Sequence, residues 1–579
     1  MPSPTSAKTN TARQMGALVA THATPWGLAV IVFMSGYANR FACDDAIINA
    51  RVVANVLAGD GPVLNAGERI EAVTSPLWLL VLSIAAWLGV SVEVAAVWLG
   101  LLASSVAVGW TAHTAARLWP GEGPVLPLGG VVFVCLPASW QFFTSGLENG
   151  LIYLWLAASF HLLVDLARVD GASRLRTTLT GAVVGLGLLV RPDLGFTVAG
   201  LLASGLLVAR SRGDGARAAA ALILGALALP LTVQLLRMGY YGAVVPNSAI
   251  AKLPDGHRIA QGLTYLRDFY GRYWLWVPLG IVAWIGLRAL RIGDPKRRPL
   301  ILGALAAAAL ARHAYIVWIG GDFMHGRWWL PPLFLVLMPV MAFRLPAASG
   351  RRRLELAGLA AIAVWSVIVA SSVRPSADRD DHISDERRTW VEWSGREHPI
   401  LASDYSALGW YDVGAEYRAL AASPGPRRLV LSGRFWGEPA TYEAADWYPP
   451  SVRLVGDACP LGVLSVVAGR DVFIVDRWGL GDPYAARIER LLEGQIGHER
   501  MLENPWLLAR HASVDTPLDE RGRSARRALR CGLLRELHLA TTAPMTPARF
   551  ARNLWHAWDL TWLRIPRDVG TAERLFCGD

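Results

Sequence analysis

Long hydrophobic stretches recur through the first two-thirds of the chain, and they constrain the fold more strongly than any other feature. Several reach about 20 residues, the length that a helix needs to cross the hydrocarbon core of a bilayer. The composition agrees, because 53% of the 579 residues are hydrophobic and only 18% are charged, whereas soluble proteins carry roughly 25% charged residues. The sequence therefore predicts a polytopic α-helical membrane protein.

The polar interruptions between these stretches predict the individual transmembrane helices, about 11 in number. They are expected at 25–41, 94–116, 125–142, 151–166, 177–190, 194–208, 218–236, 274–290, 300–319, 328–343 and 356–373. The apolar piece at 77–90 is short for a span, so we expect a re-entrant or interfacial helix there. The residues before the first helix lack the pattern of a cleavable signal peptide and are expected to form a cytoplasmic tail.

The net charge of +10 would fit a nucleic-acid partner, but its distribution favours membrane topology instead. Arginine-rich groups at 168–176, 210–217, 288–298 and 351–353 occupy short loops at alternate ends of successive hydrophobic segments. The positive-inside rule assigns such loops to the cytoplasm. We therefore predict a multi-pass plasma-membrane protein with its amino terminus inside, its carboxyl terminus outside and no nucleic-acid partner.

Two domains are expected: a transmembrane catalytic domain at 1–373, with a first outer loop at 43–76, and a soluble domain at 374–579. The second is polar enough to be an extracytoplasmic mixed α/β domain, with strands at 428–431, 452–455 and 471–475 and a helical stretch at 484–492. Cys459, Cys531 and Cys577 lie in it, so one disulfide and one free thiol are possible outside the cell. The pairing stays open, and the cysteine spacing does not indicate a zinc site.

With this topology the polar motifs all fall on the outer side, and the first of them is the acidic pair Asp44 and Asp45. Ionisable residues at a membrane surface are functional candidates by default. One carboxylate could orient or deprotonate an acceptor hydroxyl while the other holds a cation or a sugar hydroxyl. A helix cap or a solvated loop pair is the alternative. Arg51 would lie near the same helix face, and Glu68 and Glu71 add two further carboxylates to this loop.

Two shorter motifs follow, each with a structural alternative. Glu148, in the string TSGLEN at 144–149, could bind an acceptor or a divalent ion, or could cap the next helix. Arg191, in the string RPD at 191–193, is suited to a bidentate contact with phosphate. An arginine and an aspartate around a proline are also common at helix junctions, where they satisfy the helix ends.

Two polar loops complete the outer set. The first carries Asn247 and Lys252, a plausible sugar or phosphate contact with one cation. The second reads GGDFMHGRWW at 320–329 and combines Asp322, His325 and Arg327 between two hydrophobic segments. Its imidazole and guanidinium could neutralise a leaving phosphate, where negative charge develops as a sugar departs. An interfacial arginine among tryptophans explains Arg327 equally well, but explains the other two residues poorly.

The chemistry that fits these motifs is glycosyl transfer from a polyprenyl-phosphate sugar. Such a donor keeps its tail in the bilayer and presents its phosphosugar at the outer surface. The enzyme must supply cations for the phosphate and a carboxylate for the acceptor hydroxyl, and both residue types occur here. No GxGxxG or Walker pattern is present to hold a nucleotide sugar.

The motifs also resemble those of a known family. An acidic pair in the first outer loop, followed by a re-entrant helix, resembles the GT-C superfamily of membrane glycosyltransferases. The strings DDAxIxxRxxxN, GxGPVxNxGExxExxTSPLW, SGLEN, RPD, YYGxxxPNSxxAK, GGDFMxGR and VDRWGLGDP, spread from residue 44 to 483, are similar to those of the actinobacterial arabinofuranosyltransferase family AftB. The resemblance implies decaprenyl-phosphoryl-arabinose as donor and a terminal β-(1→2)-arabinofuranose added to the arabinan of arabinogalactan and lipoarabinomannan.

The resemblance also implies roles for individual residues. Asp44 and Asp45 match the catalytic acidic pair, with Asp44 favoured as the acid–base residue. The donor phosphate would be bound by Arg191, Lys252, His325 and Arg327, and the sugars by Arg51, Glu68, Glu71, Glu148, Asn247 and Asp322. The sequence assigns no cofactor; a divalent cation is possible and its ligands are unknown. A β-linked donor that gives a β-linked product reacts with net retention, through either a carboxylate nucleophile or front-face attack.

Three other functions were weighed against this one. A related transferase could use another polyprenyl-phosphate sugar, because sugar choice depends on a pocket shape that the sequence does not reveal. A transporter of lipid-linked sugars would be expected to show internal repeats and broken, charged helices at mid-membrane. A catalytically inactive carbohydrate-binding scaffold would not need Asp44 and Asp45.

Overall fold

The computed structural model describes residues 24–578 apart from 120–124, 170, 172, 254–255, 290–296, 345–351, 376–381, 435–436 and 492–494. The expected cytoplasmic tail and parts of the basic loops at 288–298 and 351–353 therefore lie outside the described residues. The chain divides into two compact units. The first comprises residues 1–40, 97–230 and 258–387, and the second comprises residues 41–96, 231–257 and 388–579.

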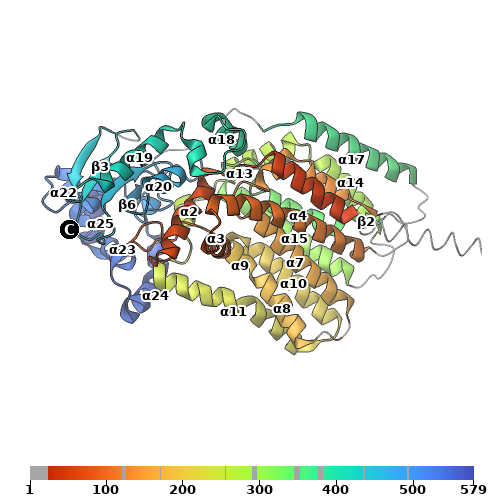
Figure 1. Cartoon of the computed structure of the whole chain (residues 1–579). Coiled ribbons are helices and arrows are strands. Elements are labelled where there is room, and N and C mark those ends of the chain that lie inside the picture. Colours follow the sequence, from red (N-terminus) through yellow and green to blue (C-terminus); the bar gives the residue numbers. More distant parts are fainter. Residues whose placement is uncertain are drawn as a thin grey trace, which may run out of the picture. The chain divides into compact units, whose positions relative to one another are not determined.

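The first unit is helical (Figure 1). Its helices are Thr24–Ala38, α5 (Leu128–Val134), α6 (Pro137–Phe142), α7 (Asn149–Arg168), α8 (Arg174–Gly185), α9 (Gly187–Val190), α10 (Gly195–Ser211), α13 (Ile259–Leu266), α14 (Trp276–Ala289), α15 (Arg298–Ile319), α16 (Leu330–Leu337) and α17 (Arg352–Ser372). The unit boundaries at 96/97 and 230/231 fall inside two long helices, α4 (Val92–Leu118) and α11 (Gly215–Tyr241). A short ladder pairs β1 (Val125–Leu126) with β2 (Phe343–Arg344).

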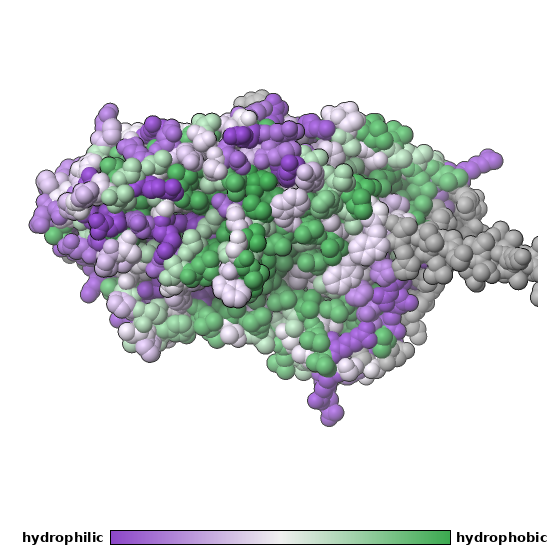
Figure 2. Space-filling model, viewed as in Figure 1, coloured by the Kyte–Doolittle hydropathy of each residue, from purple (hydrophilic) through white to green (hydrophobic). Residues whose placement is uncertain are grey.

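Six helices of the described residues are long and apolar enough to cross a membrane. They are Val92–Leu118, Asn149–Arg168, Pro192–Ser211, Gly215–Tyr241, Arg298–Ile319 and Arg353–Ser372. Each coincides with a span predicted from the sequence. Shorter apolar helices occupy Thr24–Ala38, Pro76–Trp87, Trp276–Leu287 and Leu330–Val340. The face drawn in Figure 2 carries broad hydrophobic areas, as expected for helices that meet lipid, and the polytopic fold class is confirmed.

Three of the predicted spans are interrupted rather than continuous. The segment at 125–142 is divided between α5 and α6, because Pro137 begins a new helix and has no N–H to continue the old one. The segment at 177–190 is divided between α8 and α9, and the segment at 328–343 contains only the short helix α16 and a 3₁₀ turn, Met338–Val340. Hydropathy alone does not detect such breaks, so the total of about 11 spans stays a prediction.

Small residues let helices of this unit approach closely. A Cβ added to Gly185 of α8 would lie 2.0 Å from the carbonyl oxygen of Ala226 in α11, and one added to Gly181 would lie 2.2 Å from that of Leu222. No side chain fits at such distances. The two helices are therefore in backbone contact, which is a common way for membrane helices to associate.

The second unit contains a four-stranded sheet in the order β4-β3-β5-β6. The strands are β3 (Arg428–Leu431), β4 (Ala440–Glu443), β5 (Leu454–Ala458) and β6 (Val472–Asp476). β3 pairs with β5 and β5 pairs with β6 in parallel, whereas β4 is antiparallel to β3. The helices are α2 (Asp44–Leu57), α3 (Pro76–Trp87), α12 (Asn247–Lys252), α18 (Glu386–Ser394), α19 (Gly409–Ala422), α20 (Gly462–Ala468), α21 (Asn504–His511), α22 (Glu520–Ala528), α23 (Gly532–Thr542), α24 (Pro547–Trp562) and α25 (Val569–Cys577).

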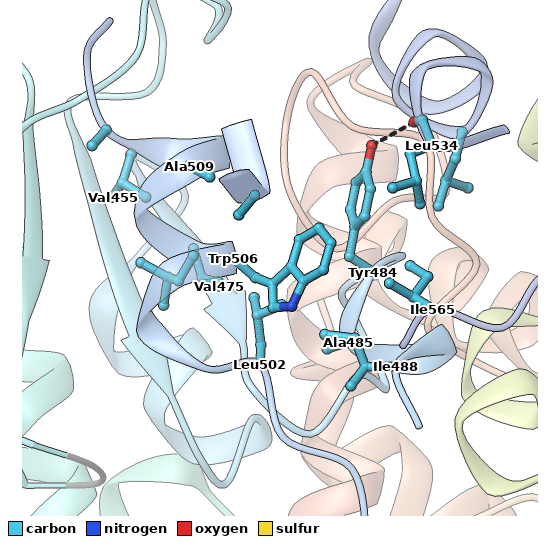
Figure 3. Close-up of a cluster of buried hydrophobic side chains, with 14 of the residues drawn as sticks. Val455, Val475, Tyr484, Ala485, Ile488, Leu502, Trp506, Ala509, Leu534 and Ile565 are labelled. Atoms are coloured by element: carbon cyan, nitrogen blue, oxygen red, sulfur yellow. Dashed lines mark hydrogen bonds between the residues drawn. The ribbon is translucent and has the colours of Figure 1, made fainter. Parts of the chain in front are cut away.

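The core of this unit is apolar and close-packed (Figure 3). Trp506 of α21 lies among Val475 of β6, Leu502 and Ile488, all of them buried. Tyr484 is also buried there, and its hydroxyl donates a hydrogen bond of 2.9 Å to the carbonyl oxygen of Leu534. The continuous burial of β5 and β6 is typical of parallel strands covered on both faces.

Of the secondary structure predicted for the C-terminal part, the strands form and the helical stretch does not. The strand at 428–431 is confirmed, and those at 452–455 and 471–475 begin one or two residues further on. The helical stretch at 484–492 is wrong over its described residues, 484–491: only a 3₁₀ turn at Ala485–Arg487 forms, because the backbone becomes extended at Ile488 and pairs there with Ile565. Cys531 and Cys577 form a disulfide, and the leftover thiol is the buried Cys459.

The compact units do not follow the predicted domain boundary at 373/374. Residues 41–96, which include the predicted first outer loop, belong to the same unit as residues 388–579. The reason is visible in the contacts: α2 packs against α20, and Ala42 donates a backbone hydrogen bond of 2.9 Å to Pro399. A boundary drawn from polarity along the chain does not register such long-range pairing.

Candidate active site

The acidic pair opens α2, in the second unit, and its two carboxylates have different surroundings. Asp44 is buried at 5% exposure. Its two oxygens accept hydrogen bonds from the backbone N–H groups of Gly462 (2.7 Å) and Val463 (2.8 Å), the first residues of α20. Burial raises the pKa of Asp44 to about 6, although the two amides counteract it. This carboxylate therefore caps α20, the helix cap that the sequence left as the alternative for the pair.

Gly462 is required for this contact. A Cβ at that position would lie 2.0 Å from the backbone oxygen of Asp44. The start of α20 thus rests directly on the start of α2, and the neighbouring residue, Asp45, is fixed with it.

Asp45 is the more accessible carboxylate. Its side chain is 22% exposed, and one of its oxygens lies 3.8 Å from Nζ of Lys252 at the end of α12. A separation of 3.8 Å is longer than the 2.7–2.9 Å of a charge-assisted hydrogen bond. Lys252 therefore attracts Asp45 without a charge-assisted hydrogen bond between these two groups, and a ligand can reach the exposed part of the carboxylate.

A third carboxylate, Asp476 at the end of β6, lies close to Asp44. It accepts hydrogen bonds from the backbone N–H groups of Trp478 (2.9 Å) and Gly481 (2.8 Å). Burial raises the pKa of Asp476 to about 6, and its charge contributes to the raised pKa of Asp44. The carboxyl edge of a parallel sheet is a common place for binding residues, and Asp476 occupies it.

Four predicted sugar-binding residues of this unit hold the structure together instead. Arg51 donates to the backbone carbonyls of Leu64, Ser465, Gly469 and Val472. Glu68 is ion-paired with Arg510, which also binds Asp482. Glu71 accepts two hydrogen bonds from Arg237, at 2.6 and 3.0 Å. The amide of Asn247 donates to the backbone carbonyls of Gly479, Leu480 and Asp482.

The partners of these four residues lie within the protein, and their contact with a sugar stays a prediction. Their charges and donors are satisfied inside the protein, and each is at most 8% exposed. Burial raises the pKa of Glu68 to about 7. Asn247 holds the turn that follows β6. Arg51 holds the backbone at Leu64 together with α20 and the start of β6.

In the first unit, the RPD junction carries a network of buried ion pairs. Arg191 binds Glu148 and, at 2.7 Å, Asp193. Asp193 also binds Arg312 of α15. Burial alone would raise the pKa of Glu148, but Arg191 and Arg327 outweigh it and lower that pKa below its usual value. Arg191 is thus occupied by two carboxylates, as the helix-junction alternative anticipated.

Arg327 is held more loosely. Its guanidinium lies 3.6 Å from Glu148 and 3.6 Å from Asp322, although it is only 6% exposed. Asp322 accepts a hydrogen bond of 2.9 Å from the backbone N–H of Phe323 through one oxygen. Its other oxygen is buried without a hydrogen-bond partner. A buried charged oxygen without a partner is costly, so this pair has the capacity to bind a polar ligand.

His325, in contrast, uses both ring nitrogens within the protein. Nδ1 contacts the carboxylate of Asp268, and Nε2 lies 2.9 Å from the hydroxyl of Tyr273. Asp268 also binds Arg272 at 2.7 Å. This arrangement fixes the ring, because both of its nitrogens contact protein groups.

No group of three or more histidine, cysteine, aspartate or glutamate side chains that could hold a metal ion occurs among the residues that the structure describes. The divalent cation considered from the sequence therefore stays a prediction without assigned ligands.

Comparison with known proteins identifies the family of this chain. A terminal β-(1→2)-arabinofuranosyltransferase of Mycobacterium tuberculosis is 32% identical over 95% of this chain and 96% of its own length. This chain belongs to the AftB family. An enzyme of the same name from Corynebacterium glutamicum is 31% identical over 93% of this chain and 85% of its own. Residues 438–568 match the family model described as the AftB family C-terminal domain.

Among solved structures, ArnT from Cupriavidus metallidurans, crystallised with undecaprenyl phosphate, aligns with a TM-score of 0.42 and 14% identity. The alignment covers 78% of this chain and 89% of that chain. A likeness of this strength does not place individual residues of the AftB site.

The sequence analysis did not identify three charged residues that the structure places beside predicted site residues. Asp476 lies in the VDRWGLGDP string, which was noticed as a motif, but its proximity to Asp44 depends on the pairing of the sheet. Asp268 and Arg312 lie outside the motifs that the sequence analysis singled out. Only the position of their partners, His325 and Asp193, identifies them.

Proposed function

We propose that this protein transfers an arabinofuranosyl residue from decaprenyl-phosphoryl-arabinose to the non-reducing ends of cell-wall arabinan, in a terminal β-(1→2) linkage. The observation that carries the proposal is the accessible carboxylate Asp45 beside Lys252, backed by the buried Asp44. The similarity of this chain to two terminal β-(1→2)-arabinofuranosyltransferases supports the choice of sugar and linkage. Arabinogalactan and lipoarabinomannan are the acceptors that fit.

In this proposal Asp45 is the reacting carboxylate, and Asp44 is a positioning residue. An accessible carboxylate can remove the proton of the attacking hydroxyl, or can attack the anomeric carbon itself. Asp44 serves neither role, since both of its oxygens are bound to α20. The earlier preference for Asp44 is therefore revised. Net retention remains compatible with either a nucleophilic Asp45 or front-face attack.

The donor phosphate is assigned to Lys252, whose ammonium group lies 3.8 Å from Asp45 in the second unit. Arg327, in the first unit, stays a predicted donor contact; it lies 3.6 Å from Glu148 and from Asp322. Asp322 supplies a sugar contact through its unpartnered oxygen, while Arg191, Glu148 and His325 hold the surrounding loops.

The active site and residues 374–579 are placed on the outer side of the plasma membrane. The disulfide between Cys531 and Cys577 supports this placement, because disulfides persist in oxidising compartments and are rare in the cytosol. The lipid-linked donor supports it as well, since such donors serve reactions outside the cell, where nucleotide sugars are scarce.

The test is transfer by the purified protein in lipid nanodiscs, using synthetic decaprenyl-phosphoryl-arabinose and a short arabinofuranoside acceptor. We expect a product whose new linkage is β-(1→2) by NMR, and no product from Asp45→Asn. Decaprenyl-phosphoryl-mannose in place of the arabinose donor should give no product. Transfer from the mannose donor alone, or a wild-type protein inactive with both, would contradict the proposal. A parallel assay with EDTA decides whether a divalent cation is needed.

A further inference from the structure

The turn that follows β6 presents one aromatic side chain outward. Trp478 is partly exposed, whereas its neighbours at 476–477 and 479–482 are buried. Asp476 accepts the backbone N–H of Trp478 at 2.9 Å, and Asn247 holds the carbonyl oxygens of Gly479 and Leu480. The turn is thus fixed on both sides of the tryptophan.

His498 packs against this tryptophan. The two rings meet edge to face, with centroids 4.4 Å apart and an interplanar angle of 82°. His498 also interacts electrostatically with Asp45 and Lys252, and burial lowers its pKa to about 4. A Cβ on the adjacent Gly497 would lie 3.0 Å from Cε of Lys252. The imidazole is therefore neutral at physiological pH and lies in the same cluster as the acidic pair.

The geometry places Trp478 in the same cluster as the acidic pair. Its ring contacts His498, the residue after Gly497, whose added Cβ would meet Lys252 beside Asp45; its backbone N–H donates to Asp476. The aromatic ring and the accessible carboxylate therefore belong to one cluster, all within the second unit. The indole can stack on the apolar face of a sugar ring, and the carboxylate of Asp45 can accept a proton.

We propose that Trp478 and His498 form a subsite for the acceptor, in which the terminal arabinofuranose stacks on the indole and presents its 2-hydroxyl to Asp45. An indole has an apolar face that suits the C–H face of a sugar, together with a polar N–H. A neutral imidazole can donate or accept a hydrogen bond from a sugar hydroxyl. The subsite binds and positions the acceptor, and it rests on the function proposed above.

The experiment measures acceptor and donor parameters separately. Trp478→Ala and His498→Ala should each raise the acceptor KM about tenfold, with the donor KM unchanged. Trp478→Phe, which keeps an aromatic face, should stay within about threefold of wild type. Trp555→Ala is the matched control, because Trp555 is 81% exposed on α24 of the same unit and should leave both KM values unchanged. Thermal unfolding of each variant checks the fold.

A second measurement separates this inference from the proposed function. Binding of a synthetic arabinofuranosyl oligosaccharide to Asp45→Asn protein is followed by calorimetry, with no turnover required. The inference predicts binding that is lost when Trp478→Ala is added, even if the wild-type protein proves to use another donor. Folded Trp478 and His498 variants with unchanged acceptor KM and unchanged binding would overturn it. If Trp478→Ala does not fold, an unchanged acceptor KM in His498→Ala would do the same.

Discussion

Substitution of Asp44 should mainly change the stability of the fold, whereas substitution of Asp45 should mainly change the rate of transfer. Burial raises the pKa of Asp44 from an ordinary value of 3.8 to about 6. The charged form is therefore about 3 kcal/mol less favourable in the folded protein than in the unfolded chain. Asp44→Asn removes that penalty and keeps one oxygen for one of the two amides of α20. The amide left unpaired costs roughly 1–3 kcal/mol. The two effects offset each other, so the stability of Asp44→Asn should stay close to that of wild type.

Asp44→Ala leaves both amides of residues 462 and 463 buried and unpaired. Their combined cost of roughly 2–6 kcal/mol exceeds the relief from removing the charge in most of that range, so this variant should unfold at a lower temperature than Asp44→Asn. Asp45 is more exposed than Asp44, so Asp45→Asn should change stability less than Asp44→Ala does. Its transfer rate, however, should fall about 10²–10⁴-fold, the contribution of a positioned acid or base.

The pH dependence gives a further signature of Asp44. Because the folded pKa is the higher of the two, the folded protein binds more protons than the unfolded chain between about pH 4 and pH 6. The contribution of this group to stability therefore falls as the pH rises through that window, and Asp44→Asn should remove this trend. Unfolding midpoints and transfer rates of wild type, the three variants and Asp412→Asn, an exposed control, are compared. A loss of transfer in Asp44→Asn equal to that in Asp45→Asn, at unchanged stability, would refute the reasoning.

Three other outcomes are expected. Gly462→Ala should reduce both stability and transfer, because its Cβ would lie 2.0 Å from the backbone of α2; a wild-type unfolding midpoint would contradict this. Arg191→Gln should destabilise the fold by about 3–5 kcal/mol, because it leaves the buried carboxylates of Glu148 and Asp193 without this partner; an unchanged unfolding temperature would contradict this. Cys531→Ser should cost up to about 4 kcal/mol, since the disulfide to Cys577 spans 46 residues, and unchanged denaturant unfolding would argue against the bond.

The sequence predicted those parts of the fold that depend on local pattern. All six long apolar helices coincide with predicted spans, because spanning a bilayer needs a continuous apolar run of fixed length. The broken spans were missed where a single proline, Pro137, interrupts an apolar run. The pairing of residues 41–96 with the C-terminal part was also missed, since it depends on contacts between residues some 420 positions apart, such as Asp44 with Gly462.

The candidate site was predicted in its residue types but not in the roles of individual residues. The motifs placed Asp45, Lys252 and Arg327 among the candidates, and the structure keeps them accessible or loosely paired. They also placed Arg51 and Glu71 there, because a motif does not show whether a charge is already satisfied. His498 and Asp268 lie in no motif, and only their neighbours in space, Trp478 and His325, give them a role.

Exposure distinguishes residues that hold the fold from residues that a ligand can reach. Glu71 and Arg191 lie at 2.6–2.7 Å from their partners, and a ligand would have to break these buried bonds at a cost of several kcal/mol. Their side chains are 9% exposed, whereas that of Asp45 is 22% exposed. Among the carboxylates of the first predicted outer loop, Asp45 is therefore the one that an acceptor hydroxyl can reach without displacing a buried ion pair.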